Sequence, residues 1–375
     1  MNQLKMKLAA ITFSISVMVL FFEIALRFLP YNSGLVAAPV NAENPVYRFL
    51  PDREIRYSQD WDMKNGRTRQ INKAGFLSDV EYNAADTQPL LAVIGDSYIE
   101  AIQVDWDESV HGQLHAELSP DIRTYGFGAS YAGLAQYMSW AEFAGKTYKP
   151  DMMVVNVVPN DYLQRLPKPG QPLTGGFLGM STFVRTSDGS LDVQPTERPE
   201  EPLLKTILRQ SAIVNYLYRN MSITALPAQI RSAIDKFSSS DQPKYIANTD
   251  AIVSEEEFAL ARAQIDLFLN RLPQRSGLAK AHILLTIDGI RPALYDAAEL
   301  EKSKDTFPAV IERYLIKAGR EAGYEVIALR EHFVARHIQT GDVFEFPFNN
   351  HWNANGHNVM SNAVLSSETF KRSFP

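Results

Sequence analysis

Short apolar runs alternate with helical patterns through much of the chain, and this alternation restricts the fold more than any other feature. Leu90–Ile94 is an uninterrupted apolar run that breaks into the polar turn "GDSY", as expected for a strand buried on both faces. Further strands with their turns are predicted at 122–128, 151–161, 281–288 and 324–329, and helices at 108–118, 131–144, 309–318 and 330–338. This order predicts an α/β protein in which helices cover both faces of a parallel sheet.

The composition narrows the class of protein. A chain of 375 residues that is 45% hydrophobic can bury the core of one large or two modest domains. Asp and Glu number 43 against 37 Lys and Arg, and no basic run occurs, so a nucleic-acid partner is not expected. The absence of cysteine excludes disulfides, thiolate nucleophiles and Cys-ligated metals.

Residues 1–30 predict a membrane anchor. Lys5 and Lys7 precede the uncharged run Leu8–Phe22, and apolar character resumes after Glu23 as far as Leu29. Together this is about twenty residues, enough for a helix to cross a bilayer. A cleaved signal peptide is the alternative, but no small-x-small site closely follows the run, which favours an uncleaved anchor with the body outside the cytoplasm.

The rest of the chain is expected to form two parts. Residues 31–88, rich in polar, Pro and Asn residues, look like a lead-in or stalk. Residues 89–375 are expected to form the α/β domain, with an insertion at about 162–249 where the alternation lapses and one helix is predicted at 203–219. Alternation returns at Ser254, which forms a capping-box signature with Glu257 before a helix that runs to Leu272.

Polar residues follow several of the predicted strands. Ser97 follows the first strand, the segment 128–131 the second and Asn160 the third, and His351 lies in the loop after the last strand. The carboxyl ends of parallel strands meet at one edge, so we expect these groups to converge there. A hydroxyl, an imidazole, a carboxamide and backbone N–H groups are the set that acyl transfer through serine requires.

Three of these segments resemble the sequence blocks of the SGNH/GDSL hydrolase superfamily: "VIGDSY", "VVPND" and "NNHWNANGH". The N-terminal "EIALRFL" and the "INKAGFLSD" before the first strand are similar to membrane-anchored bacterial members. The resemblance covers most of residues 70–366 apart from the insertion. It implies a flavodoxin-like three-layer α/β/α domain that needs no metal or organic cofactor.

The resemblance also implies a role for each matching residue. Ser97 corresponds to the nucleophile and contributes its own backbone N–H to the oxyanion hole, Asn160 to the side-chain donor and His351 to the general base. The remaining oxyanion donor is usually the N–H of a glycine, and here Tyr131 aligns with it. A tyrosine keeps the N–H but lacks the conformational freedom of glycine. Pro159 replaces a frequent glycine before Asn160 and fixes the local turn.

One position departs from the superfamily pattern in a way that bears on activity. Members with His-Trp carry an aspartate two residues before the histidine, where this chain has Asn349. In serine proteases, replacing the corresponding carboxylate by asparagine costs about 10⁴ in rate. Asn349 could orient His351 through its carbonyl oxygen.

Two other accounts of the missing aspartate stay open. A carboxylate from elsewhere in the chain could supply the charge, with Glu345, Asp342 and Asp288 as candidates. Alternatively, the site could be degenerate and bind a ligand without turning it over.

Several other polar residues have simpler interpretations. Asp96 is expected to be a hydrogen-bonding turn residue, and His357 a packing or helix-start histidine. His111 and His115 are spaced i, i+4 and could in principle bind zinc, but no third ligand or nearby glutamate completes that pattern, so a solvated helix face is expected.

The resemblance therefore implies an esterase or O-acyltransferase that acts through acyl-Ser97 on acetyl esters of cell-surface or secreted polysaccharide. The implied location is the inner membrane, with a single membrane span and the catalytic domain in the periplasm or another extracytoplasmic space. An integral-membrane partner that delivers acyl groups is possible. The alternative is a non-catalytic saccharide-binding or assembly protein that keeps the fold.

Overall fold

The computed structural model describes residues 2–166, 178–223, 245–246, 249–289 and 294–375. Contacts divide the chain into two compact units. One comprises Met1–Val36, Arg53–Gln70 and Glu200–Asp241, and the other Ala37–Asp52, Ile71–Pro199 and Gln242–Pro375.

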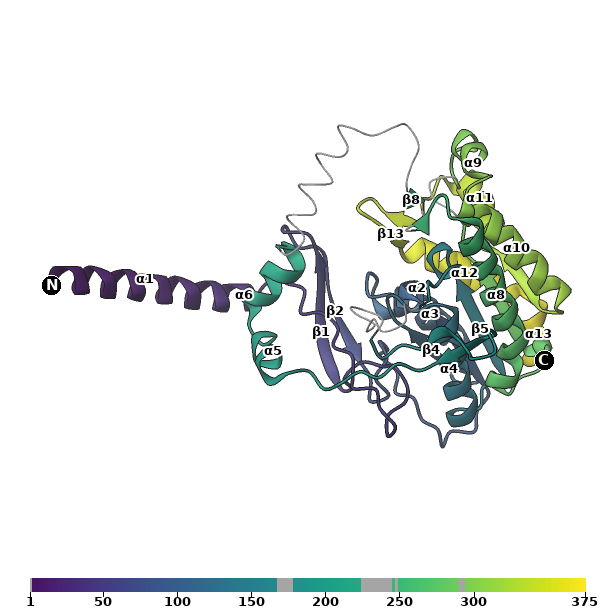
Figure 1. Ribbon diagram of the computed structural model, residues 1–375, viewed down its shortest axis with the longest axis horizontal. Coiled ribbons are helices and arrows are strands. Elements are labelled where there is room, and N and C mark those ends of the chain that lie inside the picture. Colours follow the sequence, from purple (N-terminus) through teal and green to yellow (C-terminus); the bar gives the residue numbers. More distant parts are fainter. Residues whose placement is uncertain (1, 167–177, 224–244, 247–248, 290–293) are drawn as a thin grey trace. The chain divides into compact units, whose positions relative to one another are not determined.

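The larger unit is built around a five-stranded parallel sheet (Figure 1). Its strands are β3 (Leu90–Gly95), β4 (Arg123–Gly128), β5 (Met152–Val157), β10 (Ile283–Ile287) and β11 (Glu325–Ala328). They lie in the order β11-β10-β5-β3-β4. Numbered along the chain, this is the 2-1-3-4-5 order of flavodoxin-like proteins. The predicted fold class is confirmed, and the apolar run of β3 is explained because all six of its residues are buried.

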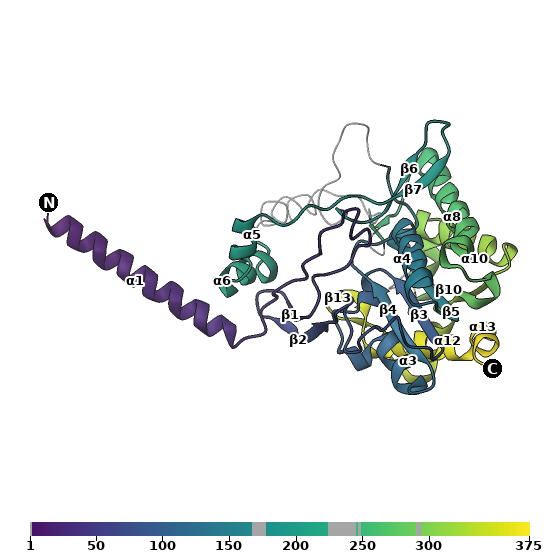
Figure 2. The same cartoon turned by 90° about the horizontal axis from the view of Figure 1, so that it is seen from below.

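Helices cover both faces of this sheet, which gives three layers (Figure 2). One face carries α4 (Leu134–Thr147), α8 (Glu255–Ser276) and α10 (Phe307–Glu321). The other carries α3 (Val110–Leu118), α11 (Leu329–Thr340), α12 (Ala354–Ser366) and α13 (Glu368–Ser373). The predicted capping box is present at the start of α8: Ser254 Oγ accepts from Glu257 N at 3.2 Å, and the Glu257 carboxylate accepts from Ser254 N at 3.1 Å.

Shorter elements connect these layers. They are α2 (Ser97–Glu100), α9 (Ala297–Ser303), η1 (Trp106–Glu108), η2 (Pro159–Asp161), η5 (Lys280–His282) and the hairpins β6 (Thr182–Arg185) with β7 (Leu191–Gln194), β8 (Tyr245–Ile246) with β9 (Thr249–Asp250) and β12 (Glu345–Phe346) with β13 (Asn349–Trp352). The last hairpin was not predicted. It places the histidine of the last sequence block on a short antiparallel strand, where Phe346 pairs with Asn349.

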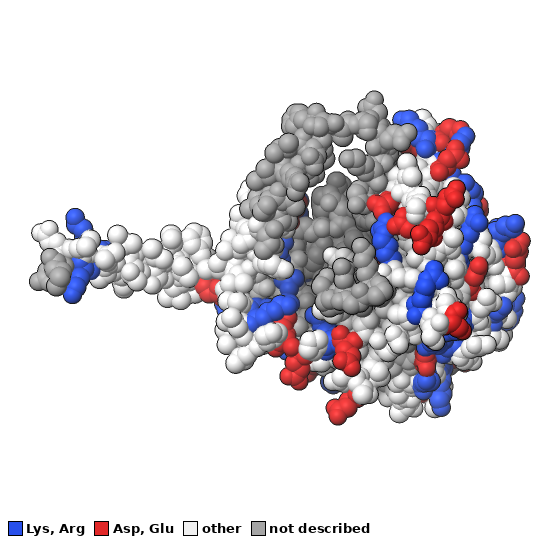
Figure 3. Space-filling model, in the orientation of Figure 1, with Lys and Arg blue, Asp and Glu red and all other residues white. Residues whose placement is uncertain are grey.

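The smaller unit contains the N-terminal helix α1 (Asn2–Arg27), the hairpin strands β1 (Arg53–Gln59) and β2 (Lys64–Ile71), and the short helices α5 (Leu203–Leu208), α6 (Ala212–Asn215) and η4 (Tyr216–Asn220). Among the described residues, one helix, Gln3–Arg27, is long and apolar enough to cross a membrane. Figure 3 shows α1 as a rod with basic side chains near its N-terminus, an uncharged middle, and charge again near its C-terminal end. A membrane-spanning segment therefore fits the N-terminus, as predicted.

Two expected features differ in detail from the structure. The single helix predicted at 203–219 is divided into α5, α6 and η4, because Ser211 caps a new helix by accepting from Val214 N at 3.3 Å. The segment expected as a lead-in, residues 31–88, contains the β1–β2 hairpin and contributes to both units. The segment expected as an insertion, residues 162–249, also contributes to both units.

Candidate functional site

Ser97 and His351 come together although 254 positions separate them in the sequence. Ser97 is the first residue of α2, separated from the end of β3 by one residue, and His351 lies on β13. Ser97 Oγ and His351 Nε2 are 2.8 Å apart, within hydrogen-bonding distance. β3 and β5 are neighbours where the strand order reverses, the place at which open α/β sheets bind ligands.

Asn349 holds the other side of the imidazole. Its Oδ1 accepts from the backbone N–H of His351 at 2.9 Å and is also hydrogen-bonded to His351 Nδ1. An amide oxygen can only accept, so Nδ1 carries the proton and Nε2 presents its lone pair to Ser97, an assignment that follows from the hydrogen-bond network. This is the tautomer that a base acting on Ser97 needs.

Tyr98 supports the same segment. Its hydroxyl donates to the carbonyl oxygen of Asn350 at 2.8 Å, and its ring centroid lies 4.9 Å from that of His351. Because Tyr98 follows Ser97 in α2, the element that carries the hydroxyl also contacts the strand that carries the imidazole.

Two of the carboxylates considered as substitutes for aspartate interact with other side chains. Glu345 accepts from the hydroxyl of Tyr295 at 2.5 Å, and Asp342 lies 3.4 Å from Nε of Arg336. The third candidate, Asp288, is fully buried and accepts from Trp352 Nε1 at 3.2 Å. Asp288 therefore hydrogen-bonds to Trp352, the residue that follows His351, whereas His351 Nδ1 hydrogen-bonds to Asn349.

Asp96 forms the turn that presents Ser97. It is fully buried, its Oδ1 accepts from Tyr98 N at 3.0 Å, and its Oδ2 lies 3.2 Å from Ser97 Oγ. Burial raises the pKa of Asp96 to about 6. Its contacts agree with the predicted role as a hydrogen-bonding turn residue.

The three residues expected to form the oxyanion hole are found on three segments. Ser97 begins α2, so its N–H belongs to the helix end where donors lack intrahelical acceptors. Asn160, exposed in η2, directs its Nδ2 toward Asp96 Oδ2 at 3.5 Å. Tyr131 is 66% exposed and has a φ of 71°, in the left-handed region that favours glycine.

The loop that carries Tyr131 is fixed by Glu100, a residue that the sequence analysis missed. The Glu100 carboxylate is buried and accepts from Ser130 N at 2.6 Å and Ser130 Oγ at 3.0 Å. At Gly128, a Cβ atom would lie 2.3 Å from the backbone nitrogen of Glu100, so this close approach requires glycine. A single charged residue between the apolar Ile99 and Ala101–Ile102 is the sequence signal that could have identified Glu100.

Asp161 fixes the turn that presents Asn160. It is buried, accepts from the Tyr137 hydroxyl at 2.7 Å and from Val158 N at 2.9 Å, and burial raises its pKa well above the usual range. The Asn-Asp pair of the third block therefore has one exposed member and one buried member that hydrogen-bonds within the turn.

The other histidines singled out from the sequence have packing surroundings. His357 is buried, with its ring 5.5 Å from that of Trp352. His111 is buried on α3 with Nε2 3.3 Å from the carbonyl oxygen of Leu77, rather than on a solvated face as expected, and His115 packs against Trp106. Among the described residues, no group of three or more His, Cys, Asp or Glu side chains could hold a metal ion.

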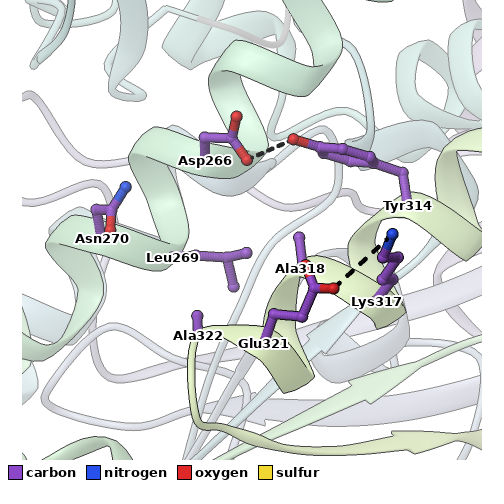
Figure 4. A pocket seen from close by; sticks show the side chains of 8 residues that line it. All are labelled: Asp266, Leu269, Asn270, Tyr314, Lys317, Ala318, Glu321 and Ala322. Atoms are coloured by element: carbon purple, nitrogen blue, oxygen red, sulfur yellow. Dashed lines mark hydrogen bonds and ion pairs between the residues drawn. The ribbon is translucent and has the colours of Figure 1, made fainter.

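A separate cavity of about 390 Å³ lies between α8 and α10 (Figure 4). Two pairs of its polar lining side chains interact: Tyr314 donates to Asp266 at 2.7 Å, and Lys317 lies 3.8 Å from Glu321. None of the residues that line it belongs to the Ser97 and His351 site.

Comparisons with known proteins give similarity in structure only. No family model matches the sequence, and no curated protein matches it. Among solved structures, an alpha/beta hydrolase enzyme from the metagenome of Lake Arreo, Spain, is 14% identical, with 76% of this chain and 96% of that chain covered and a TM-score of 0.40. A lipolytic G-D-S-L family protein from Veillonella parvula is 10% identical, with coverage of 75% and 98% and a TM-score of 0.35.

A third solved structure is a carbohydrate acetylesterase family member from Sinorhizobium meliloti, 9% identical, with coverage of 76% and 100% and a TM-score of 0.33. Similarities this low do not identify an activity, so the function is argued from the geometry of the chain's own residues. The flavodoxin-like strand order and the three sequence blocks that meet at its edge agree with the resemblance to SGNH/GDSL hydrolases.

Proposed function

We propose that this protein is a serine-dependent carboxylic ester hydrolase with Ser97 as the nucleophile. The observation that carries the proposal is the 2.8 Å contact between Ser97 Oγ and His351 Nε2, on an imidazole whose Nδ1–H donates to Asn349 Oδ1. A nucleophile hydrogen-bonded to a base, with the base oriented by a third group, is the arrangement that activates serine.

Acylation follows from this geometry. Ser97 Oγ attacks the ester carbonyl carbon while its proton moves to His351 Nε2. The negative charge that develops on the carbonyl oxygen is stabilised by the backbone N–H groups of Ser97 and Tyr131 and by Asn160 Nδ2. Collapse of the tetrahedral intermediate breaks the bond to the alcohol, which leaves with the proton from His351.

Deacylation decides between two activities. Attack by water on acyl-Ser97 releases a carboxylic acid and makes the protein an esterase. Attack by a sugar hydroxyl moves the acyl group and makes it an O-acyltransferase. We propose acetyl esters of cell-surface or secreted polysaccharide as the substrate class, because α1 would hold the domain next to the cell envelope.

This substrate class also sets the proposed location and partner. The protein would be a single-pass protein of the inner membrane, with its α/β domain in the periplasm or another extracytoplasmic space. An integral-membrane partner would deliver acyl groups if the transferase reaction operates.

Asn349 supports a second candidate, a saccharide-binding or assembly protein with a degenerate site. A neutral amide orients an imidazole but adds no charge to stabilise the imidazolium that forms when the base takes the Ser97 proton. The two candidates differ in whether the serine reacts.

Covalent labelling with a fluorophosphonate probe tests the proposal. We expect labelling of the native protein and of the matched control Ser366→Ala, which changes an exposed serine on α12, and none of Ser97→Ala. A native protein that stays unlabelled while folded, and that does not hydrolyse p-nitrophenyl acetate, would refute the enzyme proposal and leave the binding protein.

A further inference from the structure

Helix α5 carries an apolar face that the side chains of the described residues leave largely exposed. Four large side chains project from this six-residue helix, and their exposed fractions are 75% for Leu203, 69% for Leu204, 55% for Ile207 and 45% for Leu208. At about 100° per residue, the four lie within an arc of about 140°, while Lys205 and Thr206 lie outside it. An exposed apolar face on a short helix needs an apolar partner.

The segment between α5 and α6 is bonded to the last turn of α1. Arg27 Nη2 donates to the carbonyl oxygen of Gln210 at 3.0 Å. The Glu23 carboxylate accepts from Ser211 Oγ at 2.8 Å and from Ala212 N at 2.9 Å. Figures 1 and 2 show α6 next to the C-terminal end of α1, with α5 farther from that end than α6. The apolar face of α5 therefore lies close to one end of the candidate membrane span.

The length of α1 places that end at a membrane surface. Lys7 is the last basic residue before the apolar run, and about twenty helical residues are needed to cross the hydrocarbon core. Counted from Leu8, the twentieth residue is Arg27. The segment that holds Gln210 is thus joined to α1 at the level where the helix leaves the bilayer.

The same contacts explain a glutamate near the end of the apolar run of α1. Glu23 is paired with Arg27 at 2.7 Å and accepts from donors at the start of α6, so its charge is compensated where the bilayer gives way to water. Phe28, which directly follows α1, is 84% exposed, as suits an aromatic side chain at a membrane interface.

We propose that α5 lies in the lipid–water interface and buries its apolar face at the boundary between headgroups and acyl chains. The partner is the bilayer that α1 crosses. A short amphipathic helix adds little affinity alone, but held beside a spanning helix it fixes the smaller unit at the membrane surface. This inference is independent of the proposed chemistry at Ser97.

Fluorescence quenching on the full-length protein tests it. Because the chain has no cysteine, a single introduced Ile207→Cys can carry a nitrobenzoxadiazole label at one defined position. The protein is reconstituted in phosphatidylcholine–phosphatidylglycerol vesicles, and quenching by lipid-attached nitroxide is compared with quenching by aqueous iodide. Thr206→Cys on the other side of α5 is the matched control, and Phe13→Cys reports on α1.

We expect the label at 207 to be quenched by the lipid nitroxide and to be at least about fivefold less accessible to iodide than the label at 206. Equal access of iodide to both labels would overturn the proposal. Protection from iodide without quenching by lipid would also overturn it, since a protein would then cover the face. A label at 13 that the lipid nitroxide does not quench would show that α1 is outside the bilayer, and the proposal would fall with it.

Discussion

Replacing Asn349 by aspartate is the most informative change at the site. The structure gives Asn349 Oδ1 two bonds, from the backbone N–H and from Nδ1 of His351. An aspartate has the same shape and keeps the oxygen that accepts both bonds, so the turn should not move. What it adds is a negative charge next to the imidazolium that forms when the Ser97 proton is transferred.

The size of the gain follows from Coulomb's law. Two unit charges about 4 Å apart attract by about 4 kcal/mol at an effective dielectric constant of about 20 and by about 1 kcal/mol in bulk water. Asn349 and His351 are both half-buried, so the site lies between these limits. The corresponding increases in kcat/KM are about 10³-fold and about 5-fold, and we expect about 10²-fold for Asn349→Asp.

The assay is hydrolysis of p-nitrophenyl acetate by the native protein, Asn349→Asp and Asn349→Ala, with the free energy of unfolding measured for each. The alanine variant should lose activity, because nothing then accepts the Nδ1 proton. The double variant Ser97→Ala, Asn349→Asp should hydrolyse p-nitrophenyl acetate no faster than Ser97→Ala alone. If a folded Asn349→Asp variant is no faster than the native protein, then Asn349 does not occupy the place of the missing carboxylate.

Three further changes test other parts of the structure. Tyr131→Gly should raise the free energy of unfolding by about 0.5–1 kcal/mol in urea titrations, because glycine relieves the left-handed strain at an exposed position, and a loss would contradict that reading. Glu100→Ala should lower kcat about 10- to 100-fold with little change in KM, because the Ser130 N–H and hydroxyl lose the carboxylate that accepts from both. Glu100→Gln should restore much of the rate. Equal effects on kcat and KM would argue against a role of Glu100 in holding the loop. Burial raises the pKa of Glu312 from 4.5 to about 7, so the folded state binds more protons than the unfolded state between these values, and stability falls as pH rises through this window. Glu312→Gln should therefore be up to about 3 kcal/mol more stable than the native protein at pH 8 and equal to it at pH 4, whereas a pH-independent difference would refute the assignment.

Much of the sheet could be predicted from the sequence because strands buried on both faces appear as uninterrupted apolar runs. β3 is buried on both faces, so Leu90–Ile94 has no polar alternation, and its polar turn marks where Ser97 emerges. The same logic located Asn160 after β5. The positions of strand ends therefore predicted which residues meet, because parallel strands share one carboxyl edge.

The elements that the sequence did not reveal are short or depend on distant contacts. β12 and β13 contain two and four residues, too few for a periodic pattern, so the hairpin that carries His351 was unrecognised. The bonds from Glu100 to Ser130 join the first block to the loop after β4, and only the folded chain reveals them. The break between α5 and α6 depends on Glu23, nearly 190 residues earlier in the chain.

The single turn of α2 also fixes the spacing between two parts of the site. Ser97 at the start of α2 contacts His351, and Glu100 at its end holds Ser130, the neighbour of the expected oxyanion donor Tyr131. The number of residues between Ser97 and Glu100 is therefore part of the geometry of the site. Lengthening or shortening that turn by one amino acid would rotate one of the two by about 100° relative to the other. Insertions and deletions between these two positions should therefore be excluded in any working homologue, even where single substitutions are tolerated.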